Sequence, residues 1–142
     1  MSGFLLDTNV PSETLRPRPN ANVSAWLNRQ AQDSQFLSVV SVGELRRGFT
    51  LMSPGKQRTR LEQWMEQYLL PLFAGRILPV TQSIADHWGV LDAQCQLRGR
   101  PLNTADGMIA ATALQHGLTL VTRNVRDFAD LGVTVLNPWN AP

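Results

Sequence analysis

Five polar side chains lie where predicted strands give way to helices. Asp7 directly follows a run of Phe-Leu-Leu, and Glu44 follows a second apolar run. Asp106 lies at the start of an alanine-rich stretch, and Asn124 and Asp127 follow a further apolar run. An unpaired charge beside a buried strand is costly, so Asp7 needs a partner, a cation or a proton. These residue types suit a site that binds a divalent cation.

The predicted sheet would bring these side chains together. In an open α/β sheet, ligands bind in the crevice outside the carboxyl ends of the strands. Carboxylates gathered there repel one another, and Lys56 is the only lysine in the chain. An all-oxygen ligand set favours Mg²⁺ or Mn²⁺, whereas His87 and His116 are too far apart in the sequence for a zinc motif. Such a cation polarises a phosphoryl oxygen and activates water, which indicates phosphodiester hydrolysis.

Helix capping is the alternative interpretation of three of these acids. The pairs Ser41 and Glu44, Asn103 and Asp106, and Asn124 and Asp127 all have capping-box spacing. An acid in the first turn also complements the helix dipole. Asp7 fits a cap less well because Asn-Val-Pro follows closely. The residues alone leave both interpretations open.

Short apolar runs alternate with amphipathic stretches along the chain. The runs predict strands at residues 3–6, 36–40, 76–80, 118–121 and 133–136. The stretches predict helices at residues 11–15, 23–31, 41–52, 60–73, 84–97, 104–116 and 125–131. This alternation predicts an α/β sandwich around a mostly parallel sheet of four or five strands.

Two of the predicted helices have informative details. The apolar stripe of the helix at 60–73, which includes Tyr68, predicts a core-facing surface, and Pro71 should kink or end it. A homodimer surface is the less favoured interpretation of this stripe. Gly117 should close the alanine-rich helix in a left-handed conformation.

Length and composition indicate an ordinary globular protein. The 142 residues, of which 43% are hydrophobic and 17% charged, suit one domain over residues 1–142. Cys95 is the only cysteine, so an internal disulfide cannot form. There is no secretory signal and no apolar stretch approaching the roughly 20 residues of a membrane span. We therefore expect a cytoplasmic protein without a membrane partner.

The chain resembles the PIN-domain ribonucleases, especially the VapC toxins of type II toxin–antitoxin systems and their FitB-like subgroup. The matching segments are "LLDTNVPSE", "SVVSVGELRRG", "TADGMIAATALQHGLTLVTRNVRDF" and "NPW". They occur in the family's order and cover nearly the whole chain. The resemblance implies a PIN-like three-layer sandwich and a Mg²⁺- or Mn²⁺-dependent endoribonuclease. It also implies an RNA substrate, a cognate antitoxin partner and a homodimer.

The resemblance assigns roles to individual residues. The family's first three acidic positions fall on Asp7, Glu44 and Asp106; Asp7 and Asp106 would be the main metal ligands, and Glu44 would bind directly or through water. Many FitB-like members have aspartate at the fourth position, where this chain has Asn124. Asp127, one helical turn later, is the alternative for that position.

Further residues are candidates to orient these acids or to bind RNA. Thr8, Asn9 and Thr122 are expected to orient the carboxylates. Arginines flank the three later junctions and suit phosphate binding: Arg46, Arg47, Arg98, Arg100, Arg123 and Arg126.

Three alternative functions fit some of the same features. A haloacid-dehalogenase-like phosphatase needs a second acid two residues after Asp7, where this chain has Asn9. A phosphoacceptor receiver domain needs an early acidic pair and a late lysine, and Lys56 is misplaced for that role. A PIN-fold subunit of an antitoxin or repressor complex, which binds nucleic acid with little or no cleavage, remains compatible with Asn124.

Overall fold

The computed structural model describes residues 3–140 and contains one five-stranded sheet in the order β3-β2-β1-β4-β5. All four strand pairs are parallel. The strands are β1 (Phe4–Leu6), β2 (Gln35–Ser38), β3 (Ile77–Leu78), β4 (Thr119–Val121) and β5 (Val135–Leu136). This confirms the prediction of a parallel α/β sheet with five strands.

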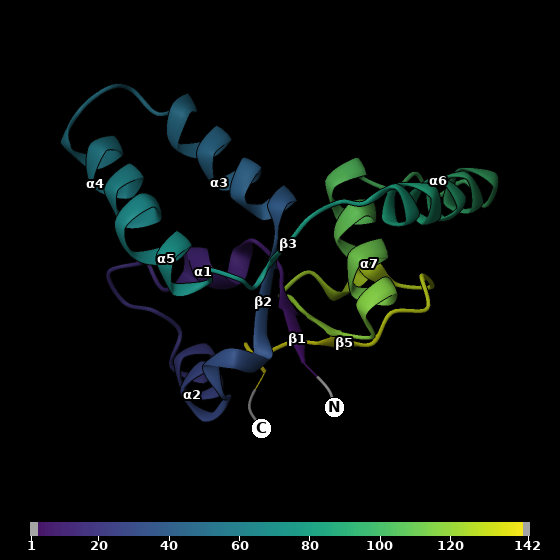
Figure 1. The fold of residues 1–142 in the computed structure, drawn as a ribbon, viewed down its shortest axis with the longest axis horizontal. Coiled ribbons are helices and arrows are strands. Elements are labelled where there is room, and N and C mark those ends of the chain that lie inside the picture. The colour runs from purple at the N-terminus through teal and green to yellow at the C-terminus, as the bar shows by residue number, and fades with distance from the viewer. Residues whose placement is uncertain (1–2, 141–142) are drawn as a thin grey trace.

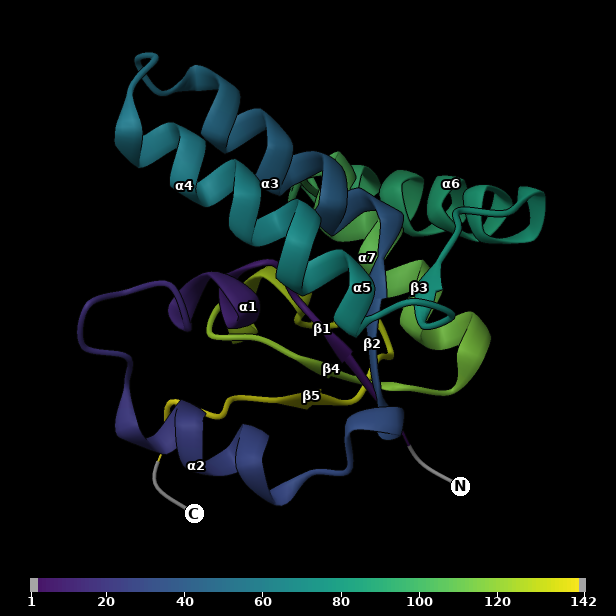
Figure 2. The same cartoon turned by 60° about the vertical axis from the view of Figure 1, so that its left-hand side comes forward.

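Helices cover both faces of the sheet, which makes three layers (Figure 1). The α-helices are α1 (Asn9–Glu13), α2 (Ala21–Arg29), α3 (Val39–Leu51), α4 (Lys56–Trp64), α5 (Leu70–Leu72), α6 (Gln82–Leu97) and α7 (Thr104–His116). Helices α6 and α7 lie on one side of the sheet, and α1, α3, α4 and α5 lie on the other. Figure 2 shows α3 and α4 running side by side as a hairpin that extends beyond the sheet. None of the helices within residues 3–140 is both long and apolar enough to cross a membrane.

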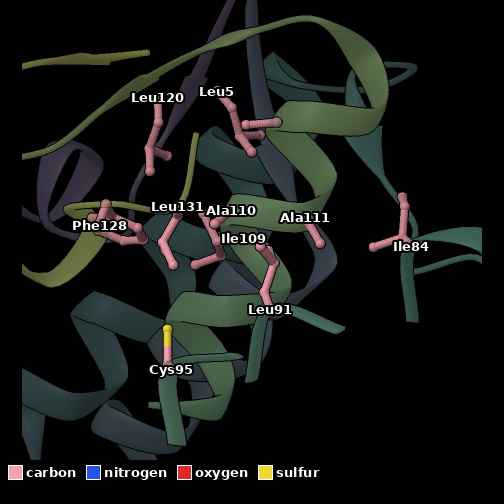
Figure 3. Close-up of a cluster of buried hydrophobic side chains, with 11 residues drawn as sticks. Leu5, Ile84, Leu91, Cys95, Ile109, Ala110, Ala111, Leu120, Phe128 and Leu131 are labelled. Carbon is pink, nitrogen blue, oxygen red and sulfur yellow. The ribbon is translucent and has the colours of Figure 1, made fainter. Parts of the chain in front are cut away.

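Side-chain alternation along the strands explains why two cores form. Successive side chains of a strand point to opposite faces, so Leu5 and Leu120 pack in one core while Leu6 and Val121 pack in the other. Figure 3 shows the first core, in which Ile109 of α7 lies among the side chains from the strands and from α6. Burial of both faces fits continuous apolar runs such as Phe-Leu-Leu in a parallel sheet.

A close helix contact sets the position of α7 against α6. A Cβ added to Gly107 would lie 2.6 Å from Trp88 Cδ1 and 2.9 Å from Leu102 Cδ2. Only glycine allows this approach. At the other end of α7, Gly117 has φ +64° and its N–H bonds to the last turn, which confirms the predicted left-handed cap.

The predicted boundary between β2 and α3 was wrong. The strand was expected to continue through Val40, but α3 begins at Val39. Ser38 is the N-cap, and its hydroxyl accepts a hydrogen bond from Val40 N at 3.0 Å. Ser41 is therefore buried inside the helix, and the predicted capping box of Ser41 with Glu44 does not form. The Ser38 cap, three residues before Ser41, starts the helix even though the next two residues are β-branched valines, which favour a strand.

The helix predicted at residues 60–73 begins at Lys56, contains a π-helical interruption before Pro71, and ends at Leu72, one residue after the proline that was expected to kink or end it. A π-helical turn spans Met65–Leu69, in which Leu70 N bonds to Met65 O. Proline has no N–H for the ladder, and the wide turn accommodates it. Met65 and Leu69 are buried as predicted, but Tyr68 is 57% exposed, so its assignment to the core was wrong.

Three shorter elements also differ from their predictions. The helix expected at 125–131 is a single 3-10 turn, Val125–Phe128. The strands expected at 76–80 and 133–136 reduce to Ile77–Leu78 and Val135–Leu136.

Candidate active site

The candidate site is built on the carboxyl end of β1, beside the end of β4. Asp7 N donates to Val121 O at 2.8 Å, which extends the β1–β4 ladder by one residue beyond β1. This backbone bond fixes where the Asp7 side chain points. Asp7 is only 5% exposed, so its carboxylate lies in the interior edge of the crevice rather than in solvent.

Three neighbouring groups hold the Asp7 carboxylate. Thr122 Oγ1 donates to Oδ2 at 2.8 Å, and Thr8 N donates to Oδ1 at 2.8 Å. Asn9 Nδ2 lies 3.4 Å from Oδ2. The Thr122 hydroxyl also accepts a bond from Asn124 N at 3.0 Å, so its own proton is free to point at Asp7. The three residues expected to orient the carboxylates thus contact the most buried one.

Glu44 reaches the same crevice from the second turn of α3. Its Oε1 accepts a hydrogen bond from Thr8 Oγ1 at 2.6 Å, and Ser41 Oγ lies 2.8 Å from the same hydroxyl. A threonine has one hydroxyl proton, so Ser41 donates to Thr8 while Thr8 donates to Glu44. The sequence analysis missed this role of Ser41. Its spacing three residues before Glu44, one turn of a helix, was the available signal.

Asp106 enters from the first turn of α7. Asn103 caps this helix, and its Oδ1 accepts a bond from Asp106 N at 3.2 Å. The cap therefore uses the backbone of Asp106 and leaves its carboxylate available. Burial, together with smaller contributions from repulsion by Asp7, Asp127 and Glu44, raises the pKa of Asp106 from 3.8 to about 6.

The pKa of Asp7 is also raised by burial and by neighbouring negative charges. Burial raises its pKa above the usual value, and the charges of Glu44 and Asp127 raise it further. The bonds from Thr122 and Thr8 act in the opposite direction, because they stabilise the charged form. Four acids from distant parts of the chain therefore interact at one crevice.

Asp127 and Asn124 differ in their surroundings. Asp127 raises the pKa of both Asp7 and Asp106, and with Asp106 it lines a cavity of about 420 Å³. Asn124 lines a separate hollow with Asn137 and Asn140, and Asp127 borders both spaces. The Asn124 side chain does not cap the following 3-10 turn. The geometry favours Asp127 as the fourth acid of the crevice.

The donor set fits a hard divalent cation that keeps part of its water shell. Among residues 3–140, no three Asp, Glu, His or Cys side chains form a ready-made metal cage. Mg²⁺ usually binds through one or two carboxylates, waters and substrate phosphates, so a full protein cage is not required. Mutual repulsion that raises the pKa values of Asp7 and Asp106 is relieved when a cation lies between them.

The six candidate arginines have different environments. Arg46 links α3 to α4 through an ion pair with Glu62, and to the following π-helical turn through an ion pair with Glu66 at 2.7 Å. The Arg123 guanidinium lies 5.6 Å from the centre of the Trp139 ring, a partner that the sequence analysis missed. Arg47 is exposed on α3. The remaining three line the 420 Å³ cavity beside Asp106 and Asp127: Arg98, Arg100 and Arg126.

Comparisons with known proteins match the whole fold. A relative named Toxin FitB from Neisseria gonorrhoeae is 46% identical over 96% of this chain and 99% of its own length. The VapC ribonuclease Y4jK of Sinorhizobium fredii is 39% identical over 96% of this chain and 97% of its own length. The crystal structure of FitAcB from Neisseria gonorrhoeae has a TM-score of 0.90 and 45% identity, covering 97% of this chain and 99% of that one.

A structure of FitAB bound to an IR36 DNA fragment has a TM-score of 0.91 and 44% identity, covering 98% of this chain and 97% of that one. The family model described as PIN domain matches residues 4–133. This chain belongs to the PIN-domain family.

Proposed function

We propose that this protein is a metal-dependent endoribonuclease and the toxin of a type II toxin–antitoxin pair. The observation that carries this proposal is the convergence of four acids on one crevice, with two pKa values raised by burial and mutual repulsion. The names of its relatives, a FitB toxin and VapC ribonucleases, support the same activity.

Asp7 and Asp106 are the proposed ligands of a Mg²⁺ or Mn²⁺ ion, with Glu44 binding directly or through water. When bound by these residues, such an ion would supply Lewis-acid polarisation of a phosphoryl oxygen and a water molecule of lowered pKa. Thr122 and the Thr8 amide hold Asp7 in the orientation that its ladder bond to β4 sets. The Thr8 hydroxyl holds Glu44 in place.

We assign the fourth acidic position to Asp127. Its charge acts on both Asp7 and Asp106, so its carboxylate can orient water or accept a proton near them. Asn124 serves through its backbone, which fixes the Thr122 hydroxyl. The arginines that line the cavity, Arg98, Arg100 and Arg126, would contact the RNA beside these acids.

Three further parts of the proposal concern partners and location. Solved relatives are toxin–antitoxin complexes, which supports a cognate antitoxin for this chain. A homodimer and a cytoplasmic location follow from resemblance to the VapC group.

Cleavage of structured RNA tests the proposal. We expect cleavage with Mg²⁺ or Mn²⁺, loss of it in EDTA, and loss of it in Asp7→Asn. Asp33→Asn is the matched control, because Asp33 is exposed in the short 3-10 helix Gln32–Ser34. Cleavage that persists in EDTA or in Asp7→Asn would refute the metal–carboxylate mechanism.

A second function has one specific observation in its favour. The structure of one relative, FitAB, was solved bound to a DNA fragment. By analogy, the second candidate function for this chain is that of a nucleic-acid-binding subunit of a repressor complex. That function predicts binding to DNA with the antitoxin and no cleavage of any RNA. The same RNA assay, run beside a DNA-binding assay of the complex, separates the two.

A further inference from the structure

A cavity beside two of the acids has the dimensions of a small-molecule site. Its volume is about 420 Å³, within the range of roughly 300–1,000 Å³ that is typical of ligand pockets. Asp106 and Asp127 lie in its wall, while Asp7 and Glu44 do not. A phosphate bound at the acids therefore has its neighbouring nucleotide next to this cavity.

The lining combines apolar surface with hydrogen-bond donors. Cys95 and Leu131 are buried side chains of the wall, and they offer an apolar surface for the face of a base. Arg98, Arg100 and Arg126 contribute guanidinium groups to the same wall. The wall is more polar than apolar, so its apolar side chains would contact the face of a base while its guanidinium groups contact the base edge or a phosphate.

One loop residue holds two of these arginines. Arg100 Nη1 pairs with Asp130 Oδ2 at 2.7 Å, and Arg98 Nη1 lies 3.4 Å from the Asp130 carbonyl oxygen. Asp130 has φ +64°, a left-handed conformation that aspartate tolerates better than most residues. The loop after the 3-10 turn thus fixes both side chains against the loop that follows α6.

Arg126 differs from this pair. It directly precedes Asp127, and no carboxylate within residues 3–140 lies at ion-pair distance from it. An unpaired guanidinium next to an acid of the candidate site suits a phosphate oxygen. Arg98 and Arg100, held by Asp130, are left to contact the base.

The available side-chain groups of the cavity are mostly donors. Asn103 Oδ1 already accepts the Asp106 amide, so this residue offers its amide N–H groups. Of the two carboxylates of the wall, Asp106 is assigned to the cation and Asp127 to the water or proton beside it, a step that rests on the proposed function. Guanine presents O6 and N7 as adjacent acceptors that match a guanidinium fork, whereas adenine has an amino donor beside N7.

We propose that this cavity is a guanine subsite, which binds the base of a nucleotide adjacent to the cleaved phosphate. The base must leave its stack to enter, because the base edges of an RNA duplex lie in a deep and narrow groove. The substrate is therefore single-stranded RNA, or a loop, with guanine beside the cut.

Mapping of cut sites in single-stranded RNA of mixed sequence tests this subsite. We expect guanine at one position flanking the cut, and no cut at that site once the strand is annealed to its complement. Replacing this guanine by 7-deazaguanine removes only N7 and should slow cleavage roughly tenfold. Cuts without any base preference would overturn the subsite while leaving the ribonuclease proposal intact.

Variants distinguish base recognition from phosphate binding. The double variant Arg98→Gln/Arg100→Gln should lose the preference for guanine over 7-deazaguanine, whereas Arg126→Gln should slow all sequences equally. Arg60→Gln is the matched control, because Arg60 is exposed on α4. An unchanged guanine preference in the double variant would refute the assignment.

A binding assay in EDTA keeps the subsite separate from the chemistry. We expect fluorescence anisotropy to show roughly tenfold tighter binding of a labelled tetranucleotide containing guanine than of its adenine counterpart. The double variant should bind both equally. Selective binding without cleavage of any RNA would refute the proposed ribonuclease and support the subsite. Equal binding of both tetranucleotides by the unmodified protein would refute the subsite.

Discussion

Removing the charge of Asp106 should stabilise the cation-free protein above neutral pH. The pKa of Asp106 is raised from 3.8 to about 6, so between these values the folded chain binds more protons at this group than the unfolded chain. Stability then falls as pH rises through this interval, because the proton that favours the folded state is lost. Asp106→Asn carries no charge and does not show this fall. The asparagine leaves the cap intact, since Asn103 bonds to the backbone N–H of residue 106.

The magnitude follows from the size of the pKa rise. Each pKa unit corresponds to about 1.4 kcal/mol, so a rise of this size is worth about 3 kcal/mol for a fully desolvated group. Asp106 is partly exposed, and solvent screening reduces the effect to about 1.5 kcal/mol. For a chain of this length, that free energy corresponds to a rise in Tm of about 6 °C.

Thermal unfolding in EDTA, followed by circular dichroism, measures this effect. We expect Asp106→Asn to melt about 6 °C above the unmodified protein at pH 7.5 and at nearly the same temperature at pH 4. Asp33→Asn should leave the difference between the two pH values unchanged. Adding Mg²⁺ at pH 7.5 should raise the Tm of the unmodified protein and affect Asp106→Asn less. An equal or lower Tm for Asp106→Asn at pH 7.5 would refute the electrostatic account.

Three other predictions test the remaining geometry. Thr122→Val removes the hydroxyl that orients the buried aspartate, and should reduce cleavage and Mn²⁺ affinity by about 10- to 100-fold, measured by RNA cleavage and calorimetry. Asp127→Asn should abolish most RNA cleavage. Asn124→Ala should retain cleavage, and Asn124→Asp should cleave RNA as fast as the unmodified protein or faster. Loss of cleavage in Asn124→Ala with full cleavage in Asp127→Asn would contradict our assignment of the fourth acid. Gly107→Ala forces its Cβ against Trp88 and should lower the free energy of unfolding by about 1–3 kcal/mol in urea, and an unchanged value contradicts the close packing.

The sequence predicted the sheet because its signals were local and strong. Phe-Leu-Leu has no polar residue and the run before Thr122 has only Thr119, and each run is buried on both faces of the sheet. The alternation of these runs with amphipathic stretches is typical of a parallel α/β sheet. Boundaries were less predictable, since Val39 and Val40 favour a strand by type and yet lie in the first turn of α3. The hydrogen bond from Val40 N to Ser38 Oγ decided that boundary.

The acids of the site and three groups that contact Asp7 (Thr8, Asn9 and Thr122) were predicted from the sequence, but the role of Ser41 was not. Asp7, Glu44 and Asp106 could be named because each follows a strand or begins a helix. The link from Glu44 to Asp7 passes through Thr8, whose hydroxyl also contacts Ser41, and contacts between residues 33 and 36 positions apart leave no local pattern. The sequence also could not predict the roles of the six arginines, because only the fold determines which guanidinium pairs with an acid and which lines a cavity.

The acids of the site differ in how firmly the protein holds them, and this explains how four acids can lie close together without forming a rigid metal cage. Asp7 is buried and held by groups from both flanking segments of the chain, whereas Glu44 and Asp127 are exposed. A rigid cage of four charges would carry the full cost of their repulsion in the absence of a cation. Exposed acids can stay solvated until a cation binds at the buried one. We therefore expect Asp7 to set the position of the ion, and Asp127 and Glu44 to adjust to it.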